Sequence, residues 1–174
     1  MSHDLSSLSS STFDESALMV REQTGAYRPA QFDEVLQAAQ QMLVSKVRDS
    51  DALATPQDVR DFLAVRLGGL EYEVFAVLHL DAGNRVIDYV EMFRGTLTQT
   101  AVYPREVLKD AMKRNSASLV LVHNHPSGLG RPSRADELLT QMLKTTLGMV
   151  DVRVIDHMIV AGPNVVSMAE LGLL

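Results

Sequence analysis

The amino-acid sequence predicts a layered α/β domain over residues 54–174. Segments with apolar residues at helical spacing alternate with short runs of β-branched and aliphatic residues. Two of these runs, EVFAVLHLD and RVIDYVEMF, flank the turn AGN and predict a hairpin. A third run, SLVLVH, is apolar throughout and is typical of a strand that is buried on both faces. We therefore expect one sheet with helices packed on its faces.

The first third of the chain predicts simpler structure. Residues 1–28 are rich in serine and have no apolar period, so we expect a flexible arm. Residues 29–53 comprise an amphipathic helix, expected over 31–47, and a linker. The apolar face of this helix consists of Phe32, Val35, Leu36, Ala39, Leu43 and Val47.

The elements of the domain follow in order. Thr55, Pro56 and Asp58 form an N-cap, an N1 proline and a capping-box acid, which predict a helix over 56–67. After the hairpin we expect a helix over 104–115, a strand over 118–123 and a helix over 134–146. Two strands, over 152–162 and 165–169, complete the chain. The expected inward faces of the last two helices are Val107, Leu108, Ala111 and Met112, and Leu138, Leu139, Met142 and Leu143.

Composition excludes several classes of protein. The chain has 174 residues, 46% of them hydrophobic and 22% charged, as in an ordinary globular protein. A net charge of −6 argues against a broad nucleic-acid-binding surface. The absence of cysteine excludes thiol nucleophiles, cysteine-ligated zinc and the zinc deaminases. Because neither a membrane-length apolar run nor a secretory signal is visible, we expect a cytoplasmic protein without a membrane partner.

The most informative segment is LVHNHPSGLGRPSRAD. His123 and His125 are two residues apart on a strand, so their side chains point to the same face. The loop after them then leads to Asp136 at the start of a helix. Two imidazoles and a carboxylate are good zinc ligands, and three protein ligands leave the open position of a catalytic site. The sequence therefore predicts one Zn²⁺ per chain, bound by these three residues.

Simpler interpretations compete with this one. Ser133 and Asp136 also have the spacing of a helix capping box. Taken alone, this pair favours a capping box over a metal site. A lone histidine at a strand end is more often packed than metal-bound. The joint pattern of two histidines, a tight loop, Ser133 and Asp136 nevertheless favours a metal site. The letters HNH do not indicate an HNH nuclease, whose residues are spread over a long ββα element.

The spacing His-x-His, seven residues, Ser, two residues, Asp resembles the JAMM (MPN-plus) metal motif. The strings EVFAVLHLD, FRGTL, VYPREVLKDA, HNHPSG, PSRAD, DHMIV and AELGLL resemble the RadC family, bacterial members of the JAMM group, over about 55–174. This resemblance implies a three-layer JAMM/MPN fold related to cytidine deaminase, with one mixed sheet flanked by helices. It also implies a zinc-activated water, Glu73 as general base and Ser133 as oxyanion stabiliser. RadC-like proteins often carry a helix-hairpin-helix region before this domain, a pattern that residues 1–53 do not show.

The residues alone leave some roles open. Glu71, Glu73 and Glu91 all compete for the role of general base, and Glu71 and Glu73 share a strand face. For His157 we favour a packed, hydrogen-bonded core residue over contact with a zinc ligand. His79 is interpreted as structural.

A basic stripe on one predicted helix has two interpretations as well. Arg105, Lys109 and Lys113 lie four residues apart and could contact phosphates. Glu106, Asp110 and the acidic balance of the chain favour a solvated helix face instead.

These observations predict a zinc-dependent hydrolase of amide or isopeptide bonds, acting on a peptide or an isopeptide-linked protein. The first alternative is a DNA-repair or DNA-transaction accessory protein with a metal site, and the second is a non-catalytic binding module. The acidic charge predicts that nucleic-acid binding is weak, and the intact set of site residues argues against a binding module. The sequence specifies no oligomeric state.

Overall fold

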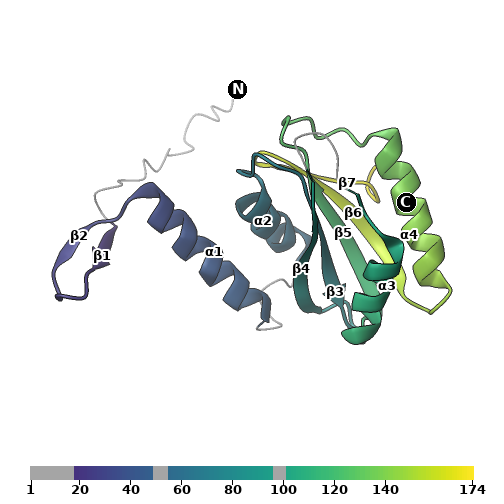
Figure 1. The fold of residues 1–174 in the computed structure, drawn as a ribbon, viewed down its shortest axis with the longest axis horizontal. Coiled ribbons are helices and arrows are strands. Elements are labelled where there is room, and N and C mark those ends of the chain that lie inside the picture. Colours follow the sequence, from purple (N-terminus) through teal and green to yellow (C-terminus); the bar gives the residue numbers. More distant parts are fainter. Residues whose placement is uncertain (1–17, 49–54, 96–100) are drawn as a thin grey trace, which may run out of the picture. The chain divides into compact units, whose positions relative to one another are not determined.

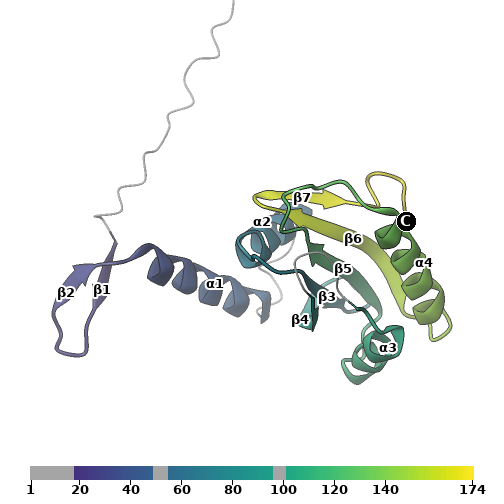
Figure 2. The ribbon, with the colours of Figure 1, turned by 45° about the horizontal axis from the view of Figure 1, so that its top comes forward.

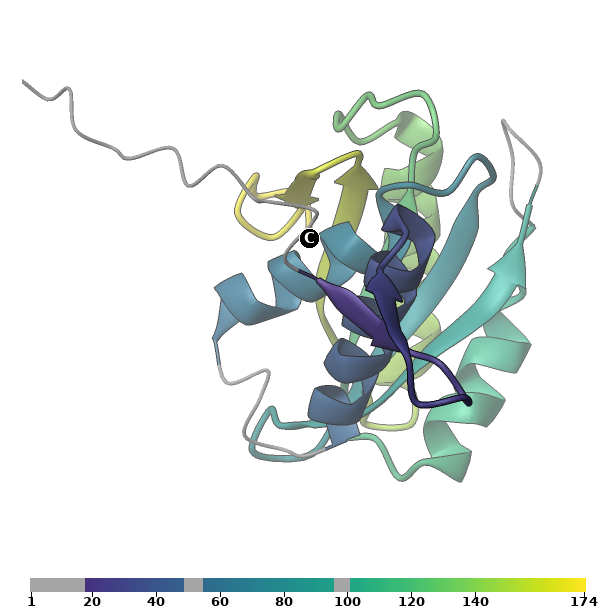
Figure 3. The same cartoon turned by 90° about the vertical axis from the view of Figure 1, so that its left-hand side faces the viewer.

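The computed structural model describes residues 18–48, 55–95 and 101–174, in two compact units that divide between Gln41 and Met42. The first unit contains strands β1 (Met19–Arg21) and β2 (Tyr27–Pro29), which pair antiparallel (Figure 3). The turn between them uses Gly25, whose φ of +86° suits a residue without a side chain. Helix α1 (Phe32–Arg48) follows and confirms the helix expected over 31–47.

The hairpin corrects part of the expectation for residues 1–28. Where no regular structure was expected, the structure pairs two strands of three residues each. Strands this short have too few residues for apolar alternation to be visible in the sequence. Residues 1–17 and 49–54, which include most of the linker expected up to residue 53, lie outside the described residues, so the flexible arm stays a prediction for residues 1–17.

The second unit is built on a mixed five-stranded sheet in the order β4-β3-β5-β6-β7 (Figure 1). Its strands are β3 (Val74–Leu80), β4 (Val86–Arg94), β5 (Ser118–Asn124), β6 (Arg153–Ala161) and β7 (Asn164–Ser167). β5 and β6 are parallel, and the other neighbours are antiparallel. The expected hairpin is confirmed, and all seven residues of β5 are buried, as the apolar run predicted.

Three helices cover the two faces of the sheet (Figure 2). Helix α2 (Pro56–Leu67) packs Phe62, Leu63 and Leu67 against one face. Helices α3 (Pro104–Lys113) and α4 (Arg134–Gly148) pack Val107 and Leu143, among others, against the other face. The expected α/β fold with three layers is confirmed.

The beginning and end of α2 follow the local sequence. Thr55 and Asp58 form the expected capping box. Gly68 ends the helix against the β6–β7 turn, and a Cβ atom there would lie 2.3 Å from the carbonyl oxygen of Gly162. This close approach, which the sequence did not indicate, requires glycine.

The expected inward faces of α3 and α4 are partly wrong. Leu138 and Met142 are 55% and 54% exposed, and Met112 is 58% exposed. On α4, Leu143 is buried and Leu139 packs against the core as expected, but the other two buried positions are Thr140 and Leu147. The four expected positions on α4 form a helical stripe, but the stripe that faces the sheet is rotated toward Thr140. Because Thr140 is polar, the spacing of apolar residues does not indicate that it is buried. In the part of the chain that the structure describes, no helix is both long and apolar enough to cross a membrane.

Candidate metal centre

The candidate site lies where the carboxyl end of β5 meets the amino end of α4. His123 is the penultimate residue of β5, and His125 directly follows the strand. Its main-chain N–H donates to the carbonyl of Val160, which extends the pairing with β6. The loop then turns at Gly128, with φ of +74°, and leads to the first turn of α4, which contains Asp136.

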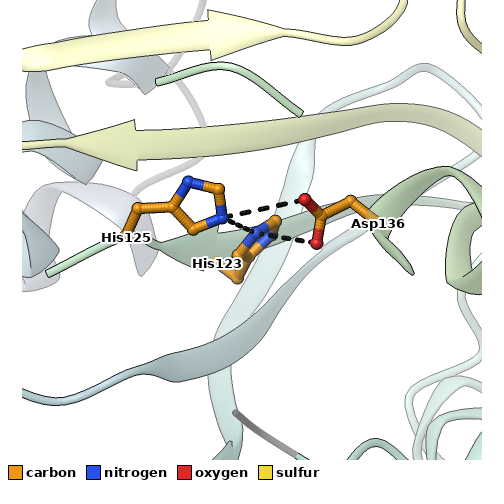
Figure 4. A group of neighbouring side chains, drawn as sticks. All are labelled: His123, His125 and Asp136. Carbon is orange, nitrogen blue, oxygen red and sulfur yellow. Dashed lines mark hydrogen bonds and ion pairs between the residues drawn. The ribbon is translucent and has the colours of Figure 1, made fainter. Parts of the chain in front are cut away.

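The three predicted ligands converge. Nε2 of His123 lies 2.9 Å from Nε2 of His125 and 3.2 Å from Oδ1 of Asp136. Nε2 of His125 lies 3.7 Å from Oδ2 of Asp136. Figure 4 shows the three side chains pointing toward one another, and one ligand atom from each lies within 4.8 Å of the others. These residues could hold a single metal ion.

The capping box of α4 is also present, so Asp136 has two roles at once. Its Oδ2 accepts a hydrogen bond of 2.6 Å from the main-chain N–H of Ser133, and Oγ of Ser133 accepts one from the N–H of Asp136. Burial raises the pKa of Asp136, but the hydrogen bonds from His123 and Ser133 outweigh it and hold the pKa well below its usual range. Asp136 is therefore an anion, which suits a metal ligand.

The hydrogen bond of His125 shows which of its nitrogens is free. Nδ1 lies 2.6 Å from the carbonyl oxygen of Leu129. A carbonyl can only accept, so Nδ1 carries the hydrogen. In the neutral imidazole, Nε2 then presents its lone pair to His123 and Asp136, which is the state that a metal ligand needs.

A cavity of about 550 Å³ opens beside this cluster and is lined by Glu73 among others. Glu73 lies two residues before Phe75, whose register partner on β5 is His123. Of the three acids that the sequence left open, Glu73 is the one that lines the cavity. Glu71 is exposed, and Glu91 binds the guanidinium of Arg66 at 2.8 Å.

Ser133 also lines the cavity. Its Oγ accepts from the N–H of Asp136, and its hydroxyl also interacts with the carboxylate of that residue. A hydroxyl in the wall of a cavity can donate a hydrogen bond to a bound molecule.

Asn124, between the two histidines, has a role that the sequence did not indicate. Its Oδ1 accepts a hydrogen bond of 2.7 Å from the N–H of Val74, and its Nδ2 donates one of 2.9 Å to the carbonyl of Tyr72. These two main-chain groups lie on either side of Glu73. The side chain of Asn124 therefore fixes the main chain that carries this acid.

The structure also decides between the two interpretations of His157. This residue is fully buried, and its Nε2 lies 2.9 Å from Nδ1 of His123. The interpretation as a buried, hydrogen-bonded histidine is confirmed, but the less favoured alternative, contact with a predicted zinc ligand, is also true. Only the register of β5 against β6 brings the two rings together. His79 is buried against Ser116, as expected of a structural residue.

The basic stripe on α3 resembles a solvated helix face. Glu106 lies 3.4 Å from Nε of Arg105 and 3.7 Å from Nζ of Lys109. Both cations thus have an acidic neighbour on their own helix.

Fold and site together define a three-layer α/β protein with a His/His/Asp cluster beside an acid-lined cavity. The chain belongs to the RadC family, because the model of the RadC-like JAB domain matches residues 53–173. A UPF0758 protein of Leptothrix cholodnii is 52% identical over 161 residues, or 92% of this chain and 72% of the relative. UPF0758 proteins of Polaromonas and Aromatoleum aromaticum are 54% and 53% identical, each over 86% of this chain and 67% of the relative. These names state no activity.

Proposed function

We propose that this protein is a zinc-dependent hydrolase of amide or isopeptide bonds. The observation that supports the proposal is the convergence of His123, His125 and Asp136 in the wall of a cavity that also contains Glu73 and Ser133. The donor set of two imidazoles and one carboxylate fits zinc with an open position. When bound there, zinc would acidify a water molecule and polarise the scissile carbonyl.

The residues of the chain supply the remaining chemistry. Glu73 accepts the proton of the attacking water and delivers it to the leaving amine. The hydroxyl of Ser133 donates a hydrogen bond to the oxyanion that forms at the scissile carbonyl. Asn124 keeps Glu73 in place through the main chain on both of its sides.

The cavity suits a peptide or an isopeptide-linked protein as substrate. Its walls include the apolar side chains of Phe75, Val102 and Leu139, against which an extended chain can pack. Arg131 also lines it, exposed and without an acidic partner among the described residues.

Metal analysis beside hydrolysis assays tests the proposal. We expect about one zinc per chain in the wild type and a large loss in His123→Ala and Asp136→Ala, because each removes one of three ligands. The same proteins are incubated with a panel of peptides and isopeptide-linked substrates. Equal, near-zero zinc in all three proteins would refute the metal site. Full zinc without cleavage of any substrate would favour the binding module, and steep salt-dependent DNA affinity would favour the DNA-transaction protein.

A further inference from the structure

We infer that Thr140 and His157 form a one-way hydrogen-bond relay that fixes the tautomer of His123 and ties this ligand to the main chain of Asp136. Thr140 and His157 are fully buried and do not line the cavity. They are therefore positioning residues. The inference concerns the proposed metal site and is independent of whether the protein hydrolyses anything.

The direction of the relay follows from its last acceptor. Oγ1 of Thr140 lies 2.6 Å from the carbonyl oxygen of Asp136, one turn earlier in α4. A carbonyl oxygen can only accept, so the hydroxyl hydrogen of Thr140 points to it. The sulfur of Met168 is 3.8 Å away and is the weaker acceptor.

The hydroxyl of Thr140 must therefore accept from its other neighbour. Nδ1 of His157 lies 2.6 Å from Oγ1 of Thr140, so Nδ1 carries a hydrogen. His157 is fully buried and its two ring nitrogens face a hydroxyl and an imidazole, so the ring is neutral and has only this one N–H. Its Nε2 is then unprotonated, and the lone pair of this nitrogen faces Nδ1 of His123.

The same assignment of donors and acceptors shows which nitrogen of His123 carries a hydrogen. Its Nδ1 lies 2.9 Å from that lone pair and must donate, so it carries the ring hydrogen. Its Nε2 faces His125 and Asp136, and once it gives up any proton that it shares with them it presents the lone pair that a metal ion binds. His125 reaches the same state separately, through the carbonyl of Leu129.

The relay begins at one ligand and ends on the main chain of another. It therefore fixes the rotation of the His123 ring and its distance to the first turn of α4 together. Losing a partner that orients a metal-binding histidine typically weakens metal affinity by about 10- to 100-fold. We expect the same loss here when His157 cannot accept from His123.

The chain contains a matched control at the other end of β3. His79 is also fully buried, and its Nδ1 also lies near a hydroxyl, at 2.9 Å from Oγ of Ser116. Among the described residues, its two ring nitrogens face Ser116 and Asp110, and it does not belong to the cluster of His123, His125 and Asp136. Replacing His79 therefore removes a buried histidine but leaves the relay intact.

The test uses the full chain labelled with ¹⁵N. Imidazole nitrogen–hydrogen correlation spectra of the metal-free wild type give the tautomers directly. We expect His123 and His157 both to carry the hydrogen on Nδ1. Zinc dissociation constants, from competition with a chelator, are then compared for wild type, His157→Leu, His157→Gln and His79→Leu, with a thermal melt of each.

We expect His157→Leu to weaken zinc binding by about 10- to 100-fold. His157→Gln, whose amide oxygen can still accept from His123, should stay within about threefold of wild type. His79→Leu should melt earlier but bind zinc as the wild type does.

Three results would overturn the inference. They are a metal-free wild type in which Nδ1 of His123 carries no hydrogen, unchanged zinc affinity in His157→Leu, or an equal loss in His79→Leu. If His157→Leu does not fold, the tautomers and His157→Gln still decide. A wild type that binds no zinc would refute the proposed function, and the tautomers would still test the relay.

Discussion

The side-chain oxygen of Asn124 accepts a hydrogen bond of 2.7 Å from the main-chain N–H of Val74. The strand that carries His123 thus also holds the residue next to Glu73. Because the same amide donates to Tyr72, one buried side chain completes the pairing of β3 where the strand begins. The position of the acid and the position of the histidines are thereby coupled.

Asn124→Ala should lower the free energy of unfolding by about 2 to 4 kcal/mol, because a buried N–H and a half-buried carbonyl lose their partner. Urea denaturation measures this loss, and amide exchange should become faster at Val74. Asn164→Ala, at an exposed position on β7, is the control and should change stability by about 0.5 kcal/mol or less. Equal effects of the two substitutions would show that the amide contributes nothing special.

Glu73→Gln should keep the zinc and the fold while hydrolysis falls by about 10²-fold or more, because the amide cannot accept the proton of the water. Cleavage rates and zinc content are measured on the same preparations. Glu71→Gln and Glu91→Gln should retain nearly full activity, since neither residue lines the cavity. A Glu73→Gln protein that cleaves as fast as wild type would contradict the assignment of the base.

Zinc should stabilise the folded protein, because the ligands converge only after folding. At a free concentration 100 times the dissociation constant, the expected gain is about 2.7 kcal/mol. Thermal melts with and without zinc measure it. His123→Ala should lose most of this gain, whereas a similar zinc-dependent shift in that variant would place the metal elsewhere.

The lowered pKa of His79 predicts that the folded protein loses stability in acid. Burial lowers its pKa to about 4, which outweighs the opposing effect of Asp110; Arg114 lowers it further and Asp88 raises it. Nε2 of His79 lies 3.0 Å from Oδ2 of Asp110 but not in hydrogen-bond geometry. Between its ordinary value of 6.5 and about 4, the unfolded chain therefore binds a proton that the folded chain does not.

Stability should accordingly fall as the pH drops through this window, by up to about 1.4 kcal/mol per pH unit for this group. His157, whose pKa is also lowered, adds to the slope in the same direction. Urea denaturation of wild type and His79→Leu from pH 7 to pH 4.5 measures the difference. The variant should be less stable at pH 7 but show the shallower slope, and parallel curves would contradict the role of His79.

Removing residues 1–28 should leave a cooperative melt and the zinc content of the second unit unchanged. The β1–β2 hairpin belongs to the first compact unit, and the candidate site is built from residues of the second. Circular dichroism and metal analysis of the shortened protein check this. Loss of the cooperative transition would show that the removed residues support the domain.

The local signals in the sequence were reliable where neighbouring residues decide the structure. The capping boxes at Thr55 and Ser133, the hairpin of β3 and β4 and the helical segments depend on contacts within a few residues, so the sequence alone predicts them. The spacing of His123, His125 and Asp136 belongs to the same category. A strand, a tight loop and the first turn of a helix leave these side chains little freedom.

Other features depended on how distant segments pack. Which stripe of α4 faces the sheet was decided by packing, and it buried Thr140 where the sequence favoured Leu138 and Met142. The contact of His157 with His123 required the parallel register of β6 on β5. By itself, therefore, the sequence determined the layered α/β fold and the three candidate ligands, because short-range geometry specifies both. Only the tertiary structure decided which acid lines the cavity and which buried groups hold the ligands, because the deciding contacts, such as those of His157 with His123 and Thr140, join separate strands and helices.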